Sequence, residues 1–190
     1  RGYGMRTPLK CRSLILPVFL LGLFGLLYNP VEAQIYAEVR GGTAVGSHTA
    51  TAAAMELEPG LSVAGMISLQ TSGVLSLYAG FVRTQFGCSN GFCTDRDIMF
   101  AGNDARLGLS LSRGGPWMQV GLLYGGTGAD GDKLNGGIGV EAGLGLAFSA
   151  GKLRFSPGLI YRRHNASTAI RKDHAVSLSL DLGIGFQLRN

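Results

Sequence analysis

The chain has 190 residues, of which 46% are hydrophobic, 15% are charged and 31 are glycine. This length suits a single domain, the hydrophobic content excludes a disordered chain, and glycines without a three-residue period exclude collagen. The charged fraction lies well below the usual value of about 25%, which is atypical of an ordinary soluble domain.

The first 33 residues have the pattern of a secretory signal peptide. Basic residues precede an apolar run over residues 14–28, and small residues stand three and one positions before Gln34. The run contains Pro17 and is shorter than the ~20 residues that a transmembrane helix needs. We therefore predict a signal peptide over residues 1–33, with residues 1–4 upstream of the start, and one domain over residues 34–190.

Removing this leader changes the charge balance of the chain. It carries four of the 17 basic side chains and one of the 12 acidic ones, which leaves 13 basic and 11 acidic side chains in the mature protein. No run of Lys and Arg with interleaved aromatic residues occurs, so no nucleic-acid partner is predicted.

The mature chain alternates apolar with polar or small residues, which is the period of a β-strand. Each alternating run is a predicted strand of roughly ten residues, the length that crosses a bilayer when a strand is tilted. The predicted strands cover residues 35–43, 61–70, 74–84, 105–113, 117–125, 138–148, 153–162 and 175–188.

The connections between these runs alternate strictly between short and long. Short turns fall at residues 71–73, 113–116 and 149–152, whereas the connections over residues 44–59, 85–104, 126–137 and 163–174 are long and polar. Short periplasmic turns and longer outside loops are typical of an antiparallel membrane barrel. The pattern predicts an all-β fold, an eight-stranded antiparallel up-and-down transmembrane β-barrel.

The composition of the two faces decides between lipid and water outside this barrel. The polar face is mostly Gly and Ser, which suits the narrow interior of eight strands, so the apolar face is predicted to meet lipid. A secreted soluble barrel with its apolar face inward is the alternative. The aromatic residues near strand ends are predicted to form interfacial girdles: Tyr36, Phe81, Trp117, Tyr124, Phe148, Phe155, Tyr161 and Phe186.

On these features the chain resembles the small outer-membrane barrels of Gram-negative bacteria, the group of the OmpA membrane domain, OmpX and Ail. Residues 181–188 resemble their C-terminal assembly signal, with Asp181, Gly183, Phe186 and Leu188 at its key positions. Many members end on an aromatic residue, whereas this chain continues with Arg189 and Asn190. The resemblance implies an outer-membrane location, a periplasmic N-terminus and the barrel-assembly machinery as a partner.

The alternation also predicts which charged residues point into the lumen. Unpaired charges in a narrow lumen are costly, so mutual ion pairs and hydrogen bonds are expected. They would plug the lumen, and a narrow or gated pore is the alternative. The predicted lumen charges are Glu38, Arg40, Arg106, Glu141, Arg154, Arg162 and Asp181.

Two cysteines, Cys88 and Cys93, bracket four residues of the second long connection. In an oxidising compartment they are predicted to form a disulfide that stiffens this loop, with free thiols as the alternative. A zinc site is not predicted, because no further Cys or His ligands complete the spacing. A rigid outer loop would suit adhesion or surface recognition.

Enzymatic and metal-binding alternatives rest on two short segments. His164 and Ser167 offer a base and a nucleophile, but they do not reproduce the His-x-Ser-Asn order of the lipid A deacylases, which resemble this class of barrel. Asp130 and Asp132 could meet calcium, yet they lack the spacing of an EF-hand loop. We predict no catalytic residue, no metal and no cofactor.

The fourth long connection is flanked by four basic residues at the expected level of the outer-leaflet headgroups. Lipopolysaccharide phosphates would attract them, so they are predicted to contact lipid: Arg162, Arg163, Arg171 and Lys172. The sequence thus predicts a non-enzymatic outer-membrane barrel with a structural or adhesin-like role and an unknown extracellular partner. A lipid A-modifying enzyme and a narrow pore are the alternatives.

Overall fold

The computed structural model describes residues 34–50, 53–71, 73–88, 98–113, 115–129, 136–166 and 173–189. The predicted signal peptide lies outside the described residues, so its boundary at Gln34 stays a prediction. Within the described ranges, no helix is long and apolar enough to cross a membrane.

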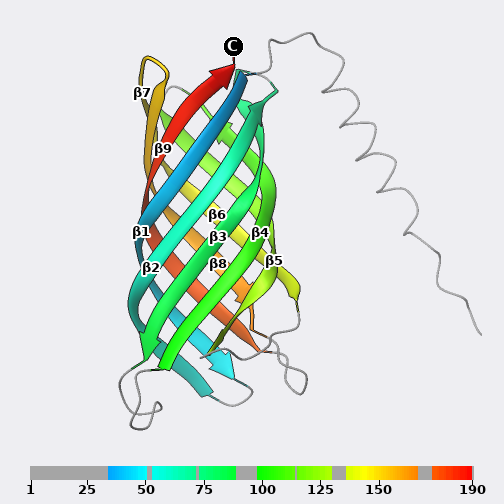
Figure 1. Ribbon diagram of the computed structural model, residues 1–190, viewed down its shortest axis with the longest axis vertical. Coiled ribbons are helices and arrows are strands. Elements are labelled where there is room, and N and C mark those ends of the chain that lie inside the picture. The colour runs from blue at the N-terminus through cyan, green and yellow to red at the C-terminus, as the bar shows by residue number, and fades with distance from the viewer. Residues whose placement is uncertain are drawn as a thin grey trace, which may run out of the picture. The chain divides into compact units, whose positions relative to one another are not determined.

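The described residues form antiparallel strands that follow one another along the chain (Figure 1). Their bounds are β1 Gln34–Ala50, β2 Ala53–Gln70, β3 Leu75–Cys88, β4 Ile98–Ser112, β5 Pro116–Ala129, β6 Gly137–Leu146, β7 Phe148–Ala150, β8 Leu153–Asn165 and β9 His174–Arg189.

These strands close into a barrel of eight, because β6 and β7 are two segments of one barrel strand. Gly145 pairs with Gly158 and Phe148 pairs with Phe155, so the register against β8 is unchanged across the break. The first strand, β1, pairs with both β2 and β9. The predicted eight-stranded antiparallel up-and-down barrel is confirmed.

The closed sheet is staggered. A path that starts at Ala37 and steps from partner to partner round the barrel returns to β1 at Ser47, not at Ala37. The partners on this path are Ile67, Ala79, Leu107, Leu122, Val140, Arg163 and Val176. A stagger of this kind tilts the strands against the barrel axis, as Figure 1 shows, and sets the width of the interior.

The strands are longer than predicted at the end that carries the long connections. The predicted loop over residues 44–59 is wrong, since β1 and β2 stay paired up to Ala50 and Ala53, with a bulge between Ala44 and Gly46. The sequence favoured a loop because apolar residues thin out there, but small and polar residues also sustain a ladder of backbone hydrogen bonds. We call this the long-hairpin end and the opposite one the short-turn end.

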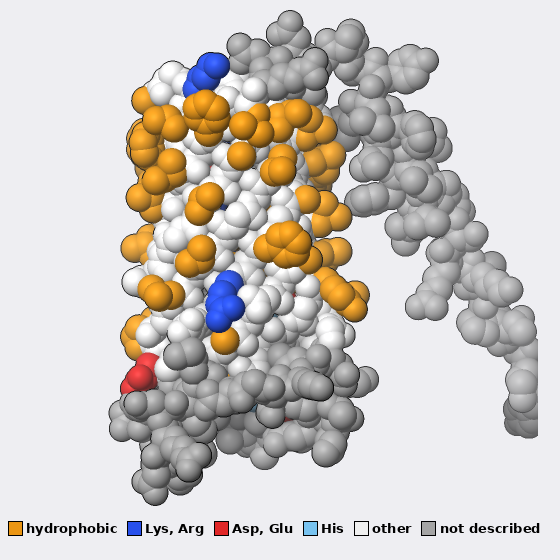
Figure 2. All heavy atoms as spheres, in the orientation of Figure 1, with side chains coloured by type: hydrophobic (Ala, Val, Ile, Leu, Met, Phe, Trp, Pro, Cys, Tyr) orange, Lys and Arg blue, Asp and Glu red, His pale blue; other side chains and the backbone are white. Residues whose placement is uncertain are grey.

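The two faces of the wall differ as predicted. Large hydrophobic side chains project outward from every part of the barrel wall, among them Val39, Ile67, Phe81, Leu107, Val120, Ile138, Leu144 and Leu180. Figure 2 shows them over the visible face, most densely toward the short-turn end. An exterior of this kind is stable in lipid and unfavourable in water.

The predicted aromatic girdle is wrong for two residues. Tyr124, Phe148 and Tyr161 are exposed on the outer face, but Tyr36 lines the interior at the short-turn end. Trp117 is only 2% exposed and also points into the lumen. Its place follows from the alternation itself, because the inward residue Gln119 lies two positions further along β5.

Candidate functional site

The lumen is filled by side chains in successive layers. Strand β4 starts at the long-hairpin end, and the side chains that it directs into the lumen include Phe100, Asp104, Arg106 and Ser112. Strand β8 runs the opposite way and presents Arg154, Ser156, Arg162 and His164 to the same interior. Since inward residues recur at every second position, the order along each strand gives the order of the layers.

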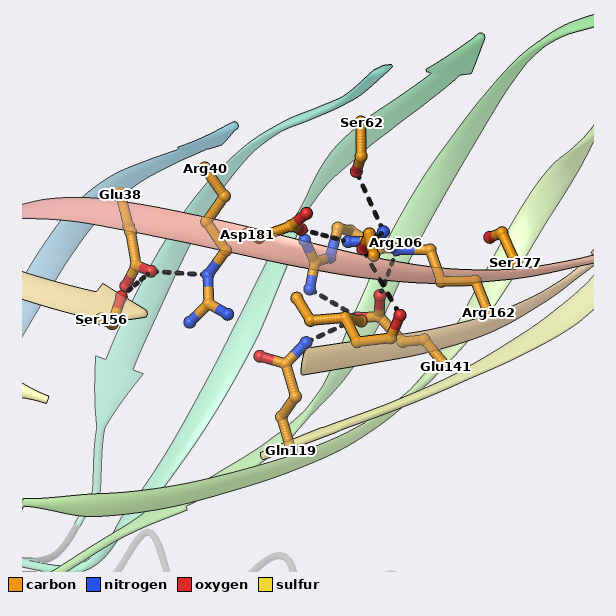
Figure 3. A network of polar contacts seen from close by, with 12 residues as sticks. Glu38, Arg40, Ser62, Arg106, Gln119, Glu141, Ser156, Arg162, Ser177 and Asp181 are labelled. Atoms are coloured by element: carbon orange, nitrogen blue, oxygen red, sulfur yellow. Dashed lines mark hydrogen bonds and ion pairs between the residues drawn. The ribbon is translucent and has the colours of Figure 1, made fainter. Parts of the chain in front are cut away.

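The middle layer is centred on the carboxylate of Glu141 (Figure 3). Arg106 donates from Nη2 to Oε1 at 2.6 Å, and Arg162 donates from Nε to Oε2 at 3.3 Å. The hydroxyl of Tyr78 donates to Oε1 at 2.6 Å. The three charged side chains are 0% exposed, so this carboxylate pairs with two guanidinium groups away from bulk water, and Arg162 also pairs with the carboxylate of Asp181.

Arg162 extends this layer to the neighbouring strands. Its Nη2 donates to Asp181 Oδ2 at 3.1 Å, and its Nη1 donates to the hydroxyls of Ser62 at 3.0 Å and Ser179 at 2.8 Å. The side chain therefore connects β8 with β2, β6 and β9 across the lumen. Charge-assisted hydrogen bonds of this kind hold the strands at fixed distances.

Two glycines let Tyr78 reach Glu141. Tyr78, Gly108, Gly121 and Glu141 are successive cross-strand partners on β3, β4, β5 and β6. A Cβ atom at Gly108 or at Gly121 would collide with the Tyr78 hydroxyl. The ring lies over both glycines, which explains part of the high glycine content of the inward face.

The next layer toward the short-turn end joins Glu38, Arg40, Ser156 and Trp117. Arg40 Nε and the Ser156 hydroxyl each donate to Glu38 Oε1 at 2.6 Å. The Arg40 guanidinium carbon lies 4.4 Å from the centre of the Trp117 ring, which is a cation–π geometry. The middle layer contains a second contact of this kind, since the Arg106 guanidinium carbon lies 5.0 Å from the centre of the Tyr78 ring.

Pro157 accounts for the break between β6 and β7, and Trp117 compensates for it. Proline at position 157 has no N–H, so it cannot donate a ladder bond to the strand opposite. The indole Nε1 of Trp117 donates instead to the carbonyl of Leu146 at 3.0 Å. The side chain thus satisfies a backbone oxygen that the interrupted ladder leaves unpaired.

Trp117→Phe is expected to lower the free energy of unfolding by about 1–3 kcal/mol, because the Leu146 carbonyl loses its donor while a smaller aromatic ring remains. Denaturant unfolding in micelles, followed by the gel shift between folded and unfolded barrel, measures this change. Gln119→Ala removes an inward side chain whose hydrogen bond within the described residues is a 3.5 Å contact to Glu141; this variant is the control and should cost less. Equal losses would argue against the role assigned to the indole N–H.

A third polar group lies beyond Arg162 toward the long-hairpin end. Asp104 Oδ2 is 2.6 Å from His164 Nδ1, and His164 Nε2 is 3.4 Å from the Ser177 hydroxyl. All three residues are about 1% exposed. The sequence pairs His164 with Ser167, which lies outside the described residues. It gives no sign of this group, because Asp104 and His164 fall into the predicted loops over residues 85–104 and 163–174, although Ser177 falls within a predicted strand.

The structure places the predicted lumen charges on the inner wall. Glu38, Arg40, Arg106, Glu141, Arg162 and Asp181 are buried, whereas Arg154 is half-buried and donates to the Ser112 hydroxyl at 3.0 Å. The predicted headgroup contact of Arg162 is wrong, because its side chain is enclosed in the lumen. Its neighbour Arg163 projects outward, as the alternation requires.

The predicted assembly signal lies on β9. Phe186 and Leu188 point outward from β9, while Asp181 and Gly183 of the same assembly signal point inward.

Cys88 ends β3, but its side chain and Cys93 lie outside the described residues, so the disulfide stays a prediction. Arg171, Lys172, Asp130 and Asp132 also lie outside them. Among the residues that the structure describes, no cluster of His, Cys, Asp or Glu could hold a metal.

A closed eight-stranded barrel with an apolar exterior and a filled polar interior defines the class of small outer-membrane β-barrels. Solved structures with this fold include Neisserial surface protein A, with a TM-score of 0.54 and 13% identity over 81% of this chain and 97% of that one. The attachment invasion locus protein Ail of Yersinia pestis has a TM-score of 0.51 and 12% identity over 82% of this chain and 100% of that one. No family model and no curated protein matches the sequence.

Proposed function

We propose that the protein is an integral outer-membrane barrel with a structural and surface-interaction role, exerted by its long hairpins on the outside of the cell. The observation that carries this proposal is the combination of two features: the exterior is apolar, and the lumen is filled by the Glu141 layer. The exterior requires a membrane, and the fully buried charges favour a plug over a pore. The N-terminus would then be periplasmic, beside the short turns.

The long-hairpin end is the part of the wall that extends furthest beyond the apolar surface. Strands β1 and β2 remain paired through Ser47, His48 and Thr49. These residues are polar, unlike the apolar residues that face lipid on a barrel wall. Ail, which has this fold, has been solved with the heparin analogue sucrose octasulfate. We include a comparable adhesin-like contact, with an extracellular partner still to be identified, in the proposal.

An epitope inserted between residues 89 and 97 should be accessible to antibody on intact cells that express the full chain. The same epitope inserted at Gly151, in a short turn, should be accessible only after the outer membrane is permeabilised. Heat-modifiable migration on gels would verify that both variants are folded. The reverse accessibility would overturn the orientation, and a steady single-channel current from the purified protein in planar bilayers would overturn the plugged lumen.

Two arginines on the outer wall favour contact with lipopolysaccharide phosphates. Arg83 and Arg163 are exposed and lie on outward positions of β3 and β8 toward the long-hairpin end. Guanidinium groups at the headgroup level attract phosphate, whereas the same groups at the bilayer centre would be costly. Arg171 and Lys172 belong to the same proposed contact.

Replacing Arg83 and Arg163 by glutamine is expected to weaken association with lipopolysaccharide severalfold in a flotation assay, because each loses a charge-assisted bond to phosphate. Arg113→Gln with Lys152→Gln removes two exposed charges at the short-turn end and is the matched control. Unchanged association of the first variant, or an equal loss in the second, would remove the support for this contact.

The alignment of Asp104, His164 and Ser177 favours one second candidate, a lipid A-modifying or other hydrolytic activity. Acid, imidazole and hydroxyl follow one another as in serine hydrolases, although the 3.4 Å step from His164 to Ser177 is long. A fluorophosphonate probe would label Ser177 and not the Ser177→Ala variant if the hydroxyl is activated. A lipid A mass spectrum that is unchanged by expression of the protein, with no labelling, would reject this candidate.

A further inference from the structure

The lumen opens into a polar cavity at its short-turn end, opposite to the hairpins. Its volume is about 330 Å³ and its wall includes Gln34, Tyr36, Gln70, Ser76, Ser112 and Arg154. This volume lies at the lower end of the ~300–1,000 Å³ typical of small-molecule sites. Amide, hydroxyl and guanidinium groups from β1, β2, β3, β4 and β8 therefore converge on a space of the size of a monosaccharide or a dipeptide.

Arg154 differs from the other inward arginines of the described residues. Arg40, Arg106 and Arg162 each lie within 3.3 Å of a carboxylate oxygen. For Arg154, the contact found within the described part of the chain is a neutral one, to the Ser112 hydroxyl at 3.0 Å. None of the described residues that line the cavity is acidic.

A half-buried guanidinium in a polar cavity without a carboxylate creates a positive potential there. Its planar group of N–H donors matches carboxylate and phosphate oxygens, and a single hydroxyl partner uses one of these donors. The hydroxyl and amide groups around it can bond the neutral part of a solute but cannot compensate the charge. The cavity thus favours an anion over a neutral molecule of the same size.

We propose that this cavity binds a small polar anion from the compartment at the short-turn end. Arg154 would hold its carboxylate or phosphate group, while Ser76, Ser112 and the glutamines would hold its hydroxyl or amide groups. This function is separate from the proposed surface role, because it lies at the other end of the barrel and requires neither an extracellular partner nor the hairpins.

The test is a titration of the isotope-labelled protein in zwitterionic micelles with D-glucuronate, inorganic phosphate and D-glucose. Saturable NMR shifts of the Arg154 Nε–Hε group and the Gly115 amide are expected with glucuronate or phosphate. Glucose has nearly the size of glucuronate but no charge, and it should give at least tenfold weaker binding, about the effect of one charge-assisted bond. Absence of saturable shifts with both anions, or equal binding of glucose, would overturn the proposal.

Arg154→Gln should abolish the shift of the Gly115 amide, whereas Lys152→Gln, which removes an exposed charge two residues away, should leave it unchanged. Arg154→Lys keeps the charge without the planar donor group and is expected to bind with intermediate affinity. If Arg154→Gln does not fold, as judged by heat-modifiable migration on gels, Arg154→Lys takes its place as the test variant. Binding that is equal in Arg154→Lys and the wild-type protein, and competes equally with chloride, would mean an unspecific ion effect and would reject the site.

Discussion

Replacing Glu141 by glutamine is expected to lower the free energy of unfolding of the barrel by about 3–5 kcal/mol, the usual loss when one partner of a buried ion pair is removed. Glutamine has the size of glutamate, so the change removes charge and leaves packing. Arg106 and Arg162 would both lose their contact to this carboxylate, and Arg106 has no other carboxylate partner within the described residues. Tyr78 would lose its charged acceptor as well.

Urea unfolding in micelles, followed by the fluorescence of Trp117, would measure this loss, because Trp117 is the only tryptophan of the chain. Glu58→Gln makes the same chemical change on an exposed side chain and should change stability by less than about 0.5 kcal/mol. Glu141→Gln combined with Arg106→Gln should recover part of the loss, since one uncompensated guanidinium is then gone. A loss at Glu141 no larger than at Glu58 would show that water enters this layer.

The architecture could be predicted because strand period and barrel geometry leave few alternatives. Once residues such as Glu38 and Arg40 are known to share one face, the alternation fixes the orientation of every residue along β1. The contrast between the Gly- and Ser-rich face and the apolar face then decides which of them is inside. These inferences need only neighbouring residues of the sequence.

The contacts in the lumen could not be predicted, because they depend on which strands face each other across the barrel. Glu141 receives Tyr78 from β3, Arg106 from β4 and Arg162 from β8. The stagger of the closed sheet sets these encounters, and the sequence contains no local signal for it. A partial signal exists in Gly108 and Gly121, since inward glycines on adjacent strands leave room for a large side chain.

Strand ends were the weakest part of the prediction, and the error affected the candidate site. Asp104 and His164 fell into predicted loops because few apolar residues surround them. In the structure β4 and β8 continue through both residues, which brings Asp104 and His164 within hydrogen-bond distance inside the lumen. Hydrophobic alternation reports where lipid lies, whereas strand pairing can continue beyond it.

Replacing Leu144 by arginine is expected to cost about 2–4 kcal/mol of folding free energy in a lipid bilayer, the range found for charges at the midplane of barrel walls. Leu144 is 58% exposed, and its cross-strand partners Met118 and Leu159 are also apolar and directed outward. The new guanidinium would therefore have lipid on its outer side and no carboxylate beside it. The loss should appear in urea unfolding in phospholipid vesicles.

Two controls separate charge from size and depth. Leu144→Met gives an unbranched apolar chain and should cost less than about 1.5 kcal/mol, whereas Ile138→Arg, toward the long-hairpin end and beside exposed Tyr124, should cost about 0–1 kcal/mol. A lumen variant such as Gly143→Ser is no neutral reference, since its Cβ would lie 3.1 Å from Gln119 Cγ and 3.2 Å from Ile160 Cγ1. If arginine costs the same at positions 144 and 138, depth in the membrane does not determine the stability of this wall, and the outward face does not meet lipid as we have assigned it.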